Sequence, residues 1–313
     1  MLIGLLCLSA SAFAQNGKDK PKTPNVSLDL KKYIDPANMD LTAKPGDDFF
    51  EHANGAWVKN NPIPNKETRW GSFGILHQEN TDRLKGILTD VGKTPGQPKG
   101  SLKQRVGDLY ASGIDSVAIE KRGYDPIKPD LERVSKVADL DGVVREAIYE
   151  RTHGVGSPLF GFGVGQDSKH PTVNILNFGQ GGTSLPDRDN YLKNDERTKK
   201  IQAAYKNYIV TLFKLTGSSD AEAAKNAETI FNIETAFAKA QLSRVAMRDP
   251  NKTYNKFAVK DFQALTPHLK WNELLPLMEV KGQDTILVSN PDFYKSTDAL
   301  LASTPVDDLK TYL

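Results

Sequence analysis

Residues 45–76 read PGDDFFEHANGAWVKNNPIPNKETRWGSFGIL, and this stretch decides the fold of the chain. Its aromatic rings stand among acidic and basic side chains, a mixture that a plain core segment does not show. Glycine permits a left-handed backbone and proline fixes φ, so Gly46, Gly55, Gly71 and the Pro62-Ile63-Pro64 break favour a compact, irregular path. We expect this segment to wrap around another part of the protein.

Several motifs within and beyond this stretch follow one another in a fixed order. Residues 48–57 give D-F-F-x-x-A-x-G-x-W, and residues 69–73 give R-W-G-x-F. The others are N-x-x-I-P at 60–64, L-Y-x-S-G-x-D at 109–115, L-P-x-R-D-x-Y at 185–191 and R-D-P-x-x-x-Y-N at 248–255. Each motif is weak alone. In this order over residues 35–313, they resemble the N-terminal part of the M13 zinc metallopeptidases, the family of neprilysin, endothelin-converting enzyme and bacterial oligopeptidase O.

The resemblance implies a mainly α-helical fold. In the family, the segment matched by residues 35–80 belongs to an edge of the catalytic domain. The region matched by residues 81–313 forms a multi-helix lid-type domain, which closes over a chamber and limits substrates to short peptides. The chain also exceeds the roughly 250 to 300 residues at which one core stops growing, so we expect several cores or an elongated domain.

The periodicity of apolar residues indicates particular helices. Ser101 is a capping residue for an apolar stripe that runs to Ile114. A second stripe fills residues 201–215, and a capping box at residues 219–222 opens the next helix, so we expect these two helices to form an antiparallel pair. Residues 158–178 carry two apolar runs around a D-S-K-H turn, which predicts a small β-hairpin.

Zinc peptidases of this kind carry H-E-x-x-H on a helix, where two imidazoles one turn apart bind the metal and the glutamate activates water. None of the five histidines precedes a glutamate or lies four residues from another. The resemblance implies that the zinc ligands lie in a C-terminal catalytic domain absent from this chain. We therefore interpret the chain as an N-terminal portion without catalytic or metal-binding residues, inactive by itself. The histidines are His52, His77, His153, His170 and His268.

The function that the resemblance implies is an exported zinc-dependent endopeptidase or oligopeptidase that hydrolyses short peptides by attack of a metal-activated water. A different class stays open, a secreted helical module that binds peptides or proteins without catalysis. With 41 basic and 39 acidic residues, the surface is mixed and has no basic stripe, so the sequence gives no support for nucleic-acid binding. The oligomeric state stays open.

Arg69 is the candidate substrate-binding residue, and its role comes from the resemblance. In the family, the arginine of the R-Y/W-G-x-F motif lines the cleft and contacts the C-terminal region of the substrate. A guanidinium is a planar, permanently charged fork that suits a carboxylate better than an ammonium does. The alternative is that Glu67 or another acid holds Arg69 structurally. Some members have a second arginine eight residues on, where this chain has His77.

The start of the chain predicts export. Residues 1–14 are uncharged and apolar and end in Ala12-Phe13-Ala14, the pattern of a secretory signal peptide cleaved before Gln15, although the usual basic start is missing. Residues 15–34 predict a flexible tether, with order beginning near Leu28. No other apolar run reaches about 18 residues, so we expect no membrane span. We expect the protein in the periplasm or outside the cell.

Cys7 is the one cysteine, and it falls within the leader. Lipid attachment at Cys7 is the alternative, although Gly4-Leu5-Leu6 before it fits a lipidation signal poorly. Where the better-known animal members have cysteines, this chain has Gly46, Asn54 and Gly113. The core must therefore hold without disulfides, which makes the resemblance closer to the bacterial oligopeptidases.

Some conspicuous residues have a structural interpretation. His52 and His77 have no neighbouring ligand in the sequence, so we expect surface or hydrogen-bonding roles for them. Asp47 and Asp48 are adjacent and point apart, which favours capping of the next helix over acid–base chemistry. Trp57 is expected in the core.

Two dipeptides and a glycine pattern are interpreted in the same way. Arg188-Asp189 and Arg248-Asp249 lie in predicted turns, where we expect buried ion pairs rather than substrate contacts. Glycines alternate over residues 161–165, but no G-x-G-x-x-G opens a helix there, so a nucleotide site is not expected.

Overall fold

The computed structural model describes residues 35–313, which divide into two compact units. Unit 1 comprises residues 35–115 and unit 2 comprises residues 116–313. The expected leader and tether, with Cys7 and the expected start of order at Leu28, lie outside the described residues.

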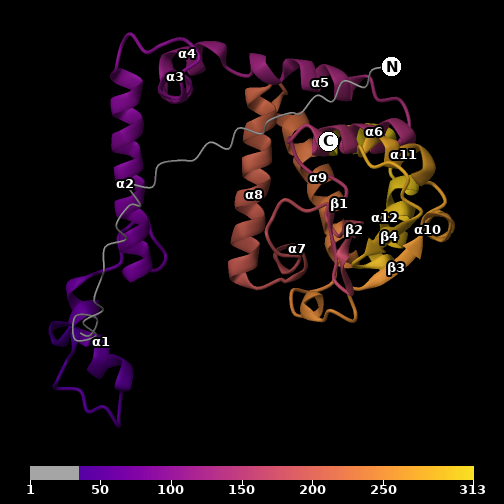
Figure 1. The fold of residues 1–313 in the computed structure, drawn as a ribbon. Helices are drawn as coiled ribbons and strands as arrows, with labels where there is room; N and C mark the ends of the chain where they lie inside the picture. Colours follow the sequence, from indigo (N-terminus) through magenta and orange to yellow (C-terminus); the bar gives the residue numbers. More distant parts are fainter. Residues whose placement is uncertain (1–34) are drawn as a thin grey trace, which may run out of the picture. The chain divides into compact units, whose positions relative to one another are not determined.

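Unit 1 is built from helices, drawn in indigo and purple in Figure 1. The long helices α2 and α3 pack closely because the chain has Gly107 at their crossing, where a Cβ atom would lie 3.0 Å from the carbonyl oxygen of Val91. The expected cap at Ser101 is confirmed, since its hydroxyl accepts from the Gln104 N–H. The elements are η2 Pro36–Asn38, α1 Phe49–Asn60, α2 Ser72–Lys93 and α3 Leu102–Ile114.

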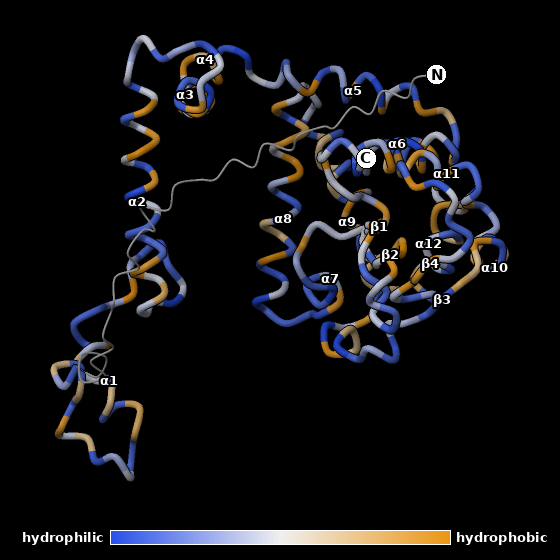
Figure 2. Tube along the Cα trace, in the orientation of Figure 1, coloured by the Kyte–Doolittle hydropathy of each residue, from blue (hydrophilic) through white to orange (hydrophobic). Residues whose placement is uncertain are grey.

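Unit 1 buries almost none of its own apolar surface. Among residues 35–115, only Gly55 and Gly107 are buried. Hydrophobic residues recur along α2 (Figure 2), yet Phe73 is 90% exposed, and Leu102 on α3 is 77% exposed. Trp57, expected in a core, is only half-buried. The apolar faces predicted from periodicity therefore exist, but unit 1 covers them only in part.

Unit 2 carries the remaining helices and all four strands of the described chain. Its first helices are α4 Ser116–Arg122, η3 Asp125–Ile127, α5 Lys128–Ser135, α6 Leu140–Thr152, α7 Asp189–Leu192, α8 Glu196–Leu215 and α9 Asp220–Ala240. Its later helices are η4 Ala246–Arg248, α10 Val259–Leu265, α11 Trp271–Leu277, α12 Pro291–Ser303 and α13 Val306–Tyr312. Its strands are β1 Gly161–Asp167, β2 His170–Gly179, β3 Asn255–Ala258 and β4 Thr285–Val288. The mainly α-helical fold class is confirmed.

The predicted β-hairpin is confirmed and belongs to a larger sheet. Strands β1 and β2 pair antiparallel around the turn at Ser168-Lys169. The sheet order is β1-β2-β4-β3, with β4 parallel to β2 and antiparallel to β3 (Figure 1). The sequence interpretation missed β3 and β4, which are four residues each and pair over long distances in the chain.

Aromatic side chains fill the core between this sheet and its helices. The ring of Trp271 lies 5.1 Å from Phe178 on β2 and 4.9 Å from Phe262 on α10, measured between centroids. Each buried polar tip has a partner: the Trp271 indole N–H donates to Thr266 Oγ1 at 2.7 Å, and the Tyr294 hydroxyl donates to the Gly179 carbonyl at 2.8 Å. Dense aromatic packing with satisfied polar atoms fixes one arrangement of the core.

The expected pair of helices is confirmed as α8 and α9, which pack together. Helix α9 starts at the predicted capping box, where the Ser219 hydroxyl accepts from the Glu222 N–H and the Glu222 carboxylate accepts from the Ser219 N–H. Its other neighbours are α7, α12 and α13. No helix among residues 35–313 is long and apolar enough to cross a membrane.

Candidate functional site

Arg69 lies in the loop that joins α1 to α2 in unit 1, and its side chain is exposed. Lys66 anchors this loop on the N-terminal side of Arg69, because its ammonium donates to Gln78 Oε1 on α2 at 2.6 Å. Neither Glu67 nor another carboxylate of residues 35–313 forms an ion pair with Arg69, since Glu67 contributes only its backbone N–H, to the Pro64 carbonyl at 2.8 Å. No acidic residue of the described chain therefore holds Arg69 in a structural ion pair.

The R-W-G-x-F motif has a packing explanation next to Arg69. The Trp70 ring folds back onto the first turn of α2, where Gly74 leaves room for it: a Cβ atom there would lie 2.9 Å from a ring carbon of Trp70. The residue after Arg69 is thus held by its ring. Together with Lys66, this anchors the backbone on both sides of the guanidinium.

The segment before the loop is fixed by contacts of the D-F-F-x-x-A-x-G-x-W motif. The Asp48 carboxylate caps α1 by accepting from the Glu51 N–H, as expected. His52 Nδ1 bonds the Ala43 carbonyl at 2.8 Å, so the expected hydrogen-bonding role is confirmed. Gly55 is required for close approach, since a Cβ atom there would lie 2.8 Å from Cβ of Asp40. His77 is exposed on α2, as expected.

Hydrogen bonds connect the region of the motif at residues 185–191 to the buried carboxylate of Glu234 on α9. Glu234 is 1% exposed, and it accepts from the Ser184 hydroxyl at 2.6 Å and from the Tyr191 hydroxyl at 3.0 Å. The Tyr191 oxygen in turn accepts from the Leu185 N–H at 2.7 Å. Burial raises the pKa of Tyr191 well above its ordinary value, so this phenol stays a hydrogen-bond donor.

The motif at residues 248–255 is connected in a similar way to Asp167 at the hairpin turn, through the hydroxyl of Tyr254. The Asp167 side chain is fully buried and accepts from the Lys169 N–H at 2.9 Å, the Tyr254 hydroxyl at 2.9 Å and the Lys256 ammonium at 3.1 Å. Burial alone would raise the pKa of Asp167, but these hydrogen bonds and the Lys256 charge hold it well below its ordinary value. The carboxylate ties the hairpin to β3.

The sequence interpretation found neither Glu234 nor Asp167. Each motif contains a tyrosine, Tyr191 in the first and Tyr254 in the second. A buried tyrosine hydroxyl needs a hydrogen-bond partner, so these two residues were the available indication of a buried acceptor. The acceptors lie far away in the chain, so spacing gave no indication of them.

The expected buried ion pairs within Arg188-Asp189 and Arg248-Asp249 are wrong. Arg188 donates to the backbone carbonyl of Gln241 after α9, while Asp189 pairs with Lys193 one helical turn on at 2.9 Å. Arg248 and Asp249 are exposed. Adjacent residues in a turn direct their side chains apart, so the arginine and the aspartate of each dipeptide do not pair with each other.

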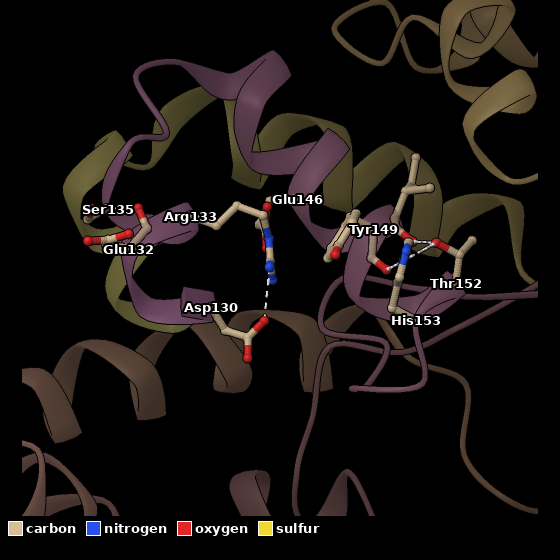
Figure 3. Close-up of polar contacts among 9 residues, drawn as sticks. Asp130, Glu132, Arg133, Ser135, Glu146, Tyr149, Thr152 and His153 are labelled. Atoms are coloured by element: carbon tan, nitrogen blue, oxygen red, sulfur yellow. Dashed lines mark hydrogen bonds and ion pairs between the residues drawn. The ribbon is translucent and has the colours of Figure 1, made fainter. Parts of the chain in front are cut away.

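A cluster of charged side chains connects α5 to α6 in unit 2 (Figure 3). Arg133 on α5 donates to Glu146 at 2.7 Å and to Asp130 at 2.9 Å, and its guanidinium carbon lies 4.0 Å from the ring centroid of Tyr149. The other side of that ring stacks on His153 at 3.7 Å. One guanidinium thus neutralises two carboxylates and covers an aromatic face.

Glu150 is a third acid near the same guanidinium, and it is only 6% exposed. Burial, with repulsion from Glu146, raises the pKa of its carboxyl to about 7, while the charge of Arg133 opposes this rise. A buried acid with such a pKa resembles a general acid–base group, but it lies inside a packed cluster, and no set of three or more metal ligands occurs among the described residues. We interpret it as structural.

No group of three or more metal-ligating side chains occurs anywhere in residues 35–313. A catalytic zinc needs three protein ligands and an open position, so the donor set of this part of the chain does not fit a zinc centre.

Three comparisons with known proteins agree on the family. The family model of the N-terminal part of peptidase family M13 matches residues 45–313. Human endothelin-converting enzyme 1 is 29% identical over 288 residues, and rat endothelin-converting enzyme-like 1 is 28% identical over 292 residues. Each alignment covers 88% of this chain and 37% of the relative. The chain thus spans well under half the length of these relatives.

The fold also matches solved structures. The zinc metalloprotease Zmp1 of Mycobacterium tuberculosis, in complex with an inhibitor, superposes with a TM-score of 0.81 at 30% identity. That match covers 89% of this chain and 42% of the Zmp1 chain. PepO from Lactobacillus rhamnosis superposes with a TM-score of 0.62 at 17% identity, which supports the fold alone. The motifs, the fold and the family model agree, and the chain belongs to peptidase family M13 over residues 45–313.

Proposed function

We propose that this chain is the N-terminal part of an exported zinc endopeptidase or oligopeptidase that hydrolyses short peptides. The observation that carries the proposal is the match to peptidase family M13 along residues 45–313. Relatives over this region are named endothelin-converting enzyme and zinc metalloprotease. Residues 35–313 offer no group of three or more metal-ligating side chains. The proposal therefore places the zinc ligands and the catalytic residues in a part of the protein outside this chain.

In this proposal, Arg69 binds the carboxylate of a short substrate. Its side chain is exposed and has no acidic partner in the described chain, while Lys66 and Trp70 anchor the backbone on both sides of it. A guanidinium that is exposed, held in position and without an acidic partner is suited to a bidentate hydrogen bond with a carboxylate.

The apolar surface of unit 1 supports a larger protein around this chain. Large side chains on each of its long helices are exposed, and such surface in a family member calls for a covering partner. We propose that the catalytic part of the same protein covers it. The exposed side chains include Phe49, Phe50, Phe73, Leu76, Leu84, Ile87, Leu102, Leu109 and Ile114.

Export is part of the same proposal and rests on the apolar leader at residues 1–14. The intact mass of the exported protein decides it. A mature chain that begins at Gln15 supports a cleaved signal, whereas a retained and acylated Cys7 supports a lipoprotein.

The activity is tested by extending the chain with its downstream coding sequence. We expect the extended protein to bind one zinc ion and to cleave an internally quenched peptide, with both properties lost on chelation. The chain by itself is expected to bind no zinc and to cleave nothing. A stop codon directly downstream, with peptide binding retained by the chain, would instead identify a non-catalytic binding module.

A further inference from the structure

Strand β1 is an open edge of the sheet in unit 2 (Figure 1). The Phe178 carbonyl on β2 accepts from the Ser289 N–H at 2.9 Å, so the backbone groups of Phe178 point toward β4. Its antiparallel partner Phe162 therefore directs its own N–H and C=O groups away from β2. Two residues on, Val164 does the same. The outer edge of β1 thus presents backbone donors and acceptors that β2 does not use.

This edge lacks the features by which proteins usually block edge strands. Residues 161–166 contain no proline and no charged residue, and the one irregularity in register falls at Gln166/Asp167 beside the turn. Val164 is 62% exposed. The edge is therefore open to another strand.

The alternating glycines give a second, independent indication. Gly161, Gly163 and Gly165 leave one face of β1 without side chains, and a Cβ atom at Gly163 would meet nothing within 4 Å. Intramolecular packing therefore does not explain the absence of a side chain at Gly163. Glycine inside a strand often marks a place where another backbone or a ligand approaches closely.

A cation lies at the start of the strand. The exposed Arg151 donates to the Phe162 carbonyl at 3.3 Å, and its guanidinium carbon lies 6.0 Å from the Phe162 ring centroid. The Arg151 guanidinium contacts this carbonyl and ring, and no carboxylate of residues 35–313 forms an ion pair with it. The guanidinium is therefore able to bind an anionic group that arrives at this end of β1.

We propose that β1 binds an extended peptide as an added antiparallel strand, with the free C-terminal carboxylate of the peptide on Arg151. An antiparallel peptide brings its C-terminus to the start of β1, where this arginine lies. Main-chain bonds at Val164 supply affinity in this mode, and the glycines leave room on one face of β1 for side chains of the added strand. The inference concerns binding alone, so it stands whether or not the protein cleaves peptides.

The test measures binding of a fluorescent heptapeptide of alternating threonine and alanine with a free C-terminus, using the whole chain. Val164→Pro removes the outward N–H, and we expect about tenfold weaker binding, the loss typical of one or two hydrogen bonds. The matched control Val164→Thr keeps the N–H and should bind within about twofold of the parent. Equal affinities for the two variants would overturn the proposal.

Two further measurements do not depend on how well Val164→Pro folds. Methylating the peptide nitrogens that face β1 should abolish binding, while methylating the alternate nitrogens should not. Amidating the peptide C-terminus should weaken binding about fivefold to the parent and not at all to Arg151→Gln. Equal effects of the two methylation patterns would overturn the edge-strand mode. Dimerisation of the chain that Val164→Pro removes would assign the edge to a second copy instead.

Discussion

At the scale of single residues, Arg69 and Glu150 represent opposite situations. Arg69 is an exposed cation without an acidic partner among residues 35–313, on a backbone anchored at both sides. Glu150 is an acid enclosed within a cluster that already contains two other carboxylates. A charge left unpaired at the surface is available for a ligand, whereas a charge enclosed by its neighbours changes stability with pH.

In the proposed complete peptidase, Arg69→Ala should lower kcat/KM by about one to two decades for peptides with a free C-terminal carboxylate, the loss expected when a charge-assisted hydrogen bond is removed. Peptides with an amidated C-terminus should be cleaved almost normally, because they never offered that charge. Arg69→Lys should recover part of the difference, since an ammonium keeps the charge but loses the fork. Equal losses on both peptide types, together with a lower melting temperature, would make Arg69 a scaffold residue.

Glu150 should make stability depend on pH. Its carboxyl has a pKa of about 7 in the folded chain, above the ordinary value of 4.5, so the folded state holds this proton more tightly. Its contribution to stability is therefore complete below a pH of about 4.5 and is lost as the pH rises through about 7. We expect Glu150→Gln to raise the free energy of unfolding by about 2 kcal/mol near pH 8.5 and to change little near pH 4.5.

Denaturant unfolding at several pH values measures this difference. The matched control is Glu132→Gln, because the Glu132 side chain is 75% exposed and pairs only loosely with Lys136 at 4.0 Å. It should shift stability by at most a few tenths of a kcal/mol at any pH. A Glu150→Gln variant with the same pH dependence as the parent would contradict the interpretation of Glu150.

At the scale of elements, caps decide where helices begin. The capping box at Ser219 satisfies two backbone N–H groups at the start of α9, a helix that contacts α8, α12 and α13. Ser219→Ala should lower the free energy of unfolding of unit 2 by about 1 kcal/mol. Ser218→Ala is the control, since no cap involves the Ser218 side chain. Equal effects of the two substitutions on the urea midpoint would show that the cap contributes nothing.

What the sequence predicted and what it missed follow from the range of each interaction. The caps at Asp48, Ser101 and Ser219 were found because the capping side chain and the backbone N–H that donates to it lie three residues apart. The hairpin was found because its strands share one turn. Strands β3 and β4 were missed since each is short and its pairing depends on residues far away in the chain.

The range of each interaction also decided which site residues the sequence indicated. Arg69 was identified through the resemblance of its motif, and its structural environment agrees with an available cation without testing its role. The carboxylates of Glu234 and Asp167 were not identified, because their side-chain donors come from residues more than 40 positions away. No local pattern encodes a contact of that kind.

At the scale of the whole molecule, the two units differ in what stabilises them. Unit 2 has a continuous core of buried aliphatic and aromatic side chains around its sheet. Unit 1 buries only two glycines among its described residues, and its helices rely on short-range hydrogen bonds and on contacts between α2 and α3. Most helical stability in proteins comes from tertiary packing of an apolar face, so unit 1 lacks an internal source of stability comparable with that of unit 2.

Native-state hydrogen exchange of the chain should therefore divide at residue 115. Amides of β2, β4 and α12 should exchange only by global unfolding of unit 2, whereas amides of α2 and α3 should open at a free-energy cost of at most about 2 kcal/mol. In the complete protein, amides of α2 and α3 should become protected, because the proposed catalytic part then covers their apolar faces. If α2 and α3 in the isolated, monomeric chain were as protected as β2, local contacts alone would stabilise unit 1. The exposed apolar side chains would then no longer support a covering domain.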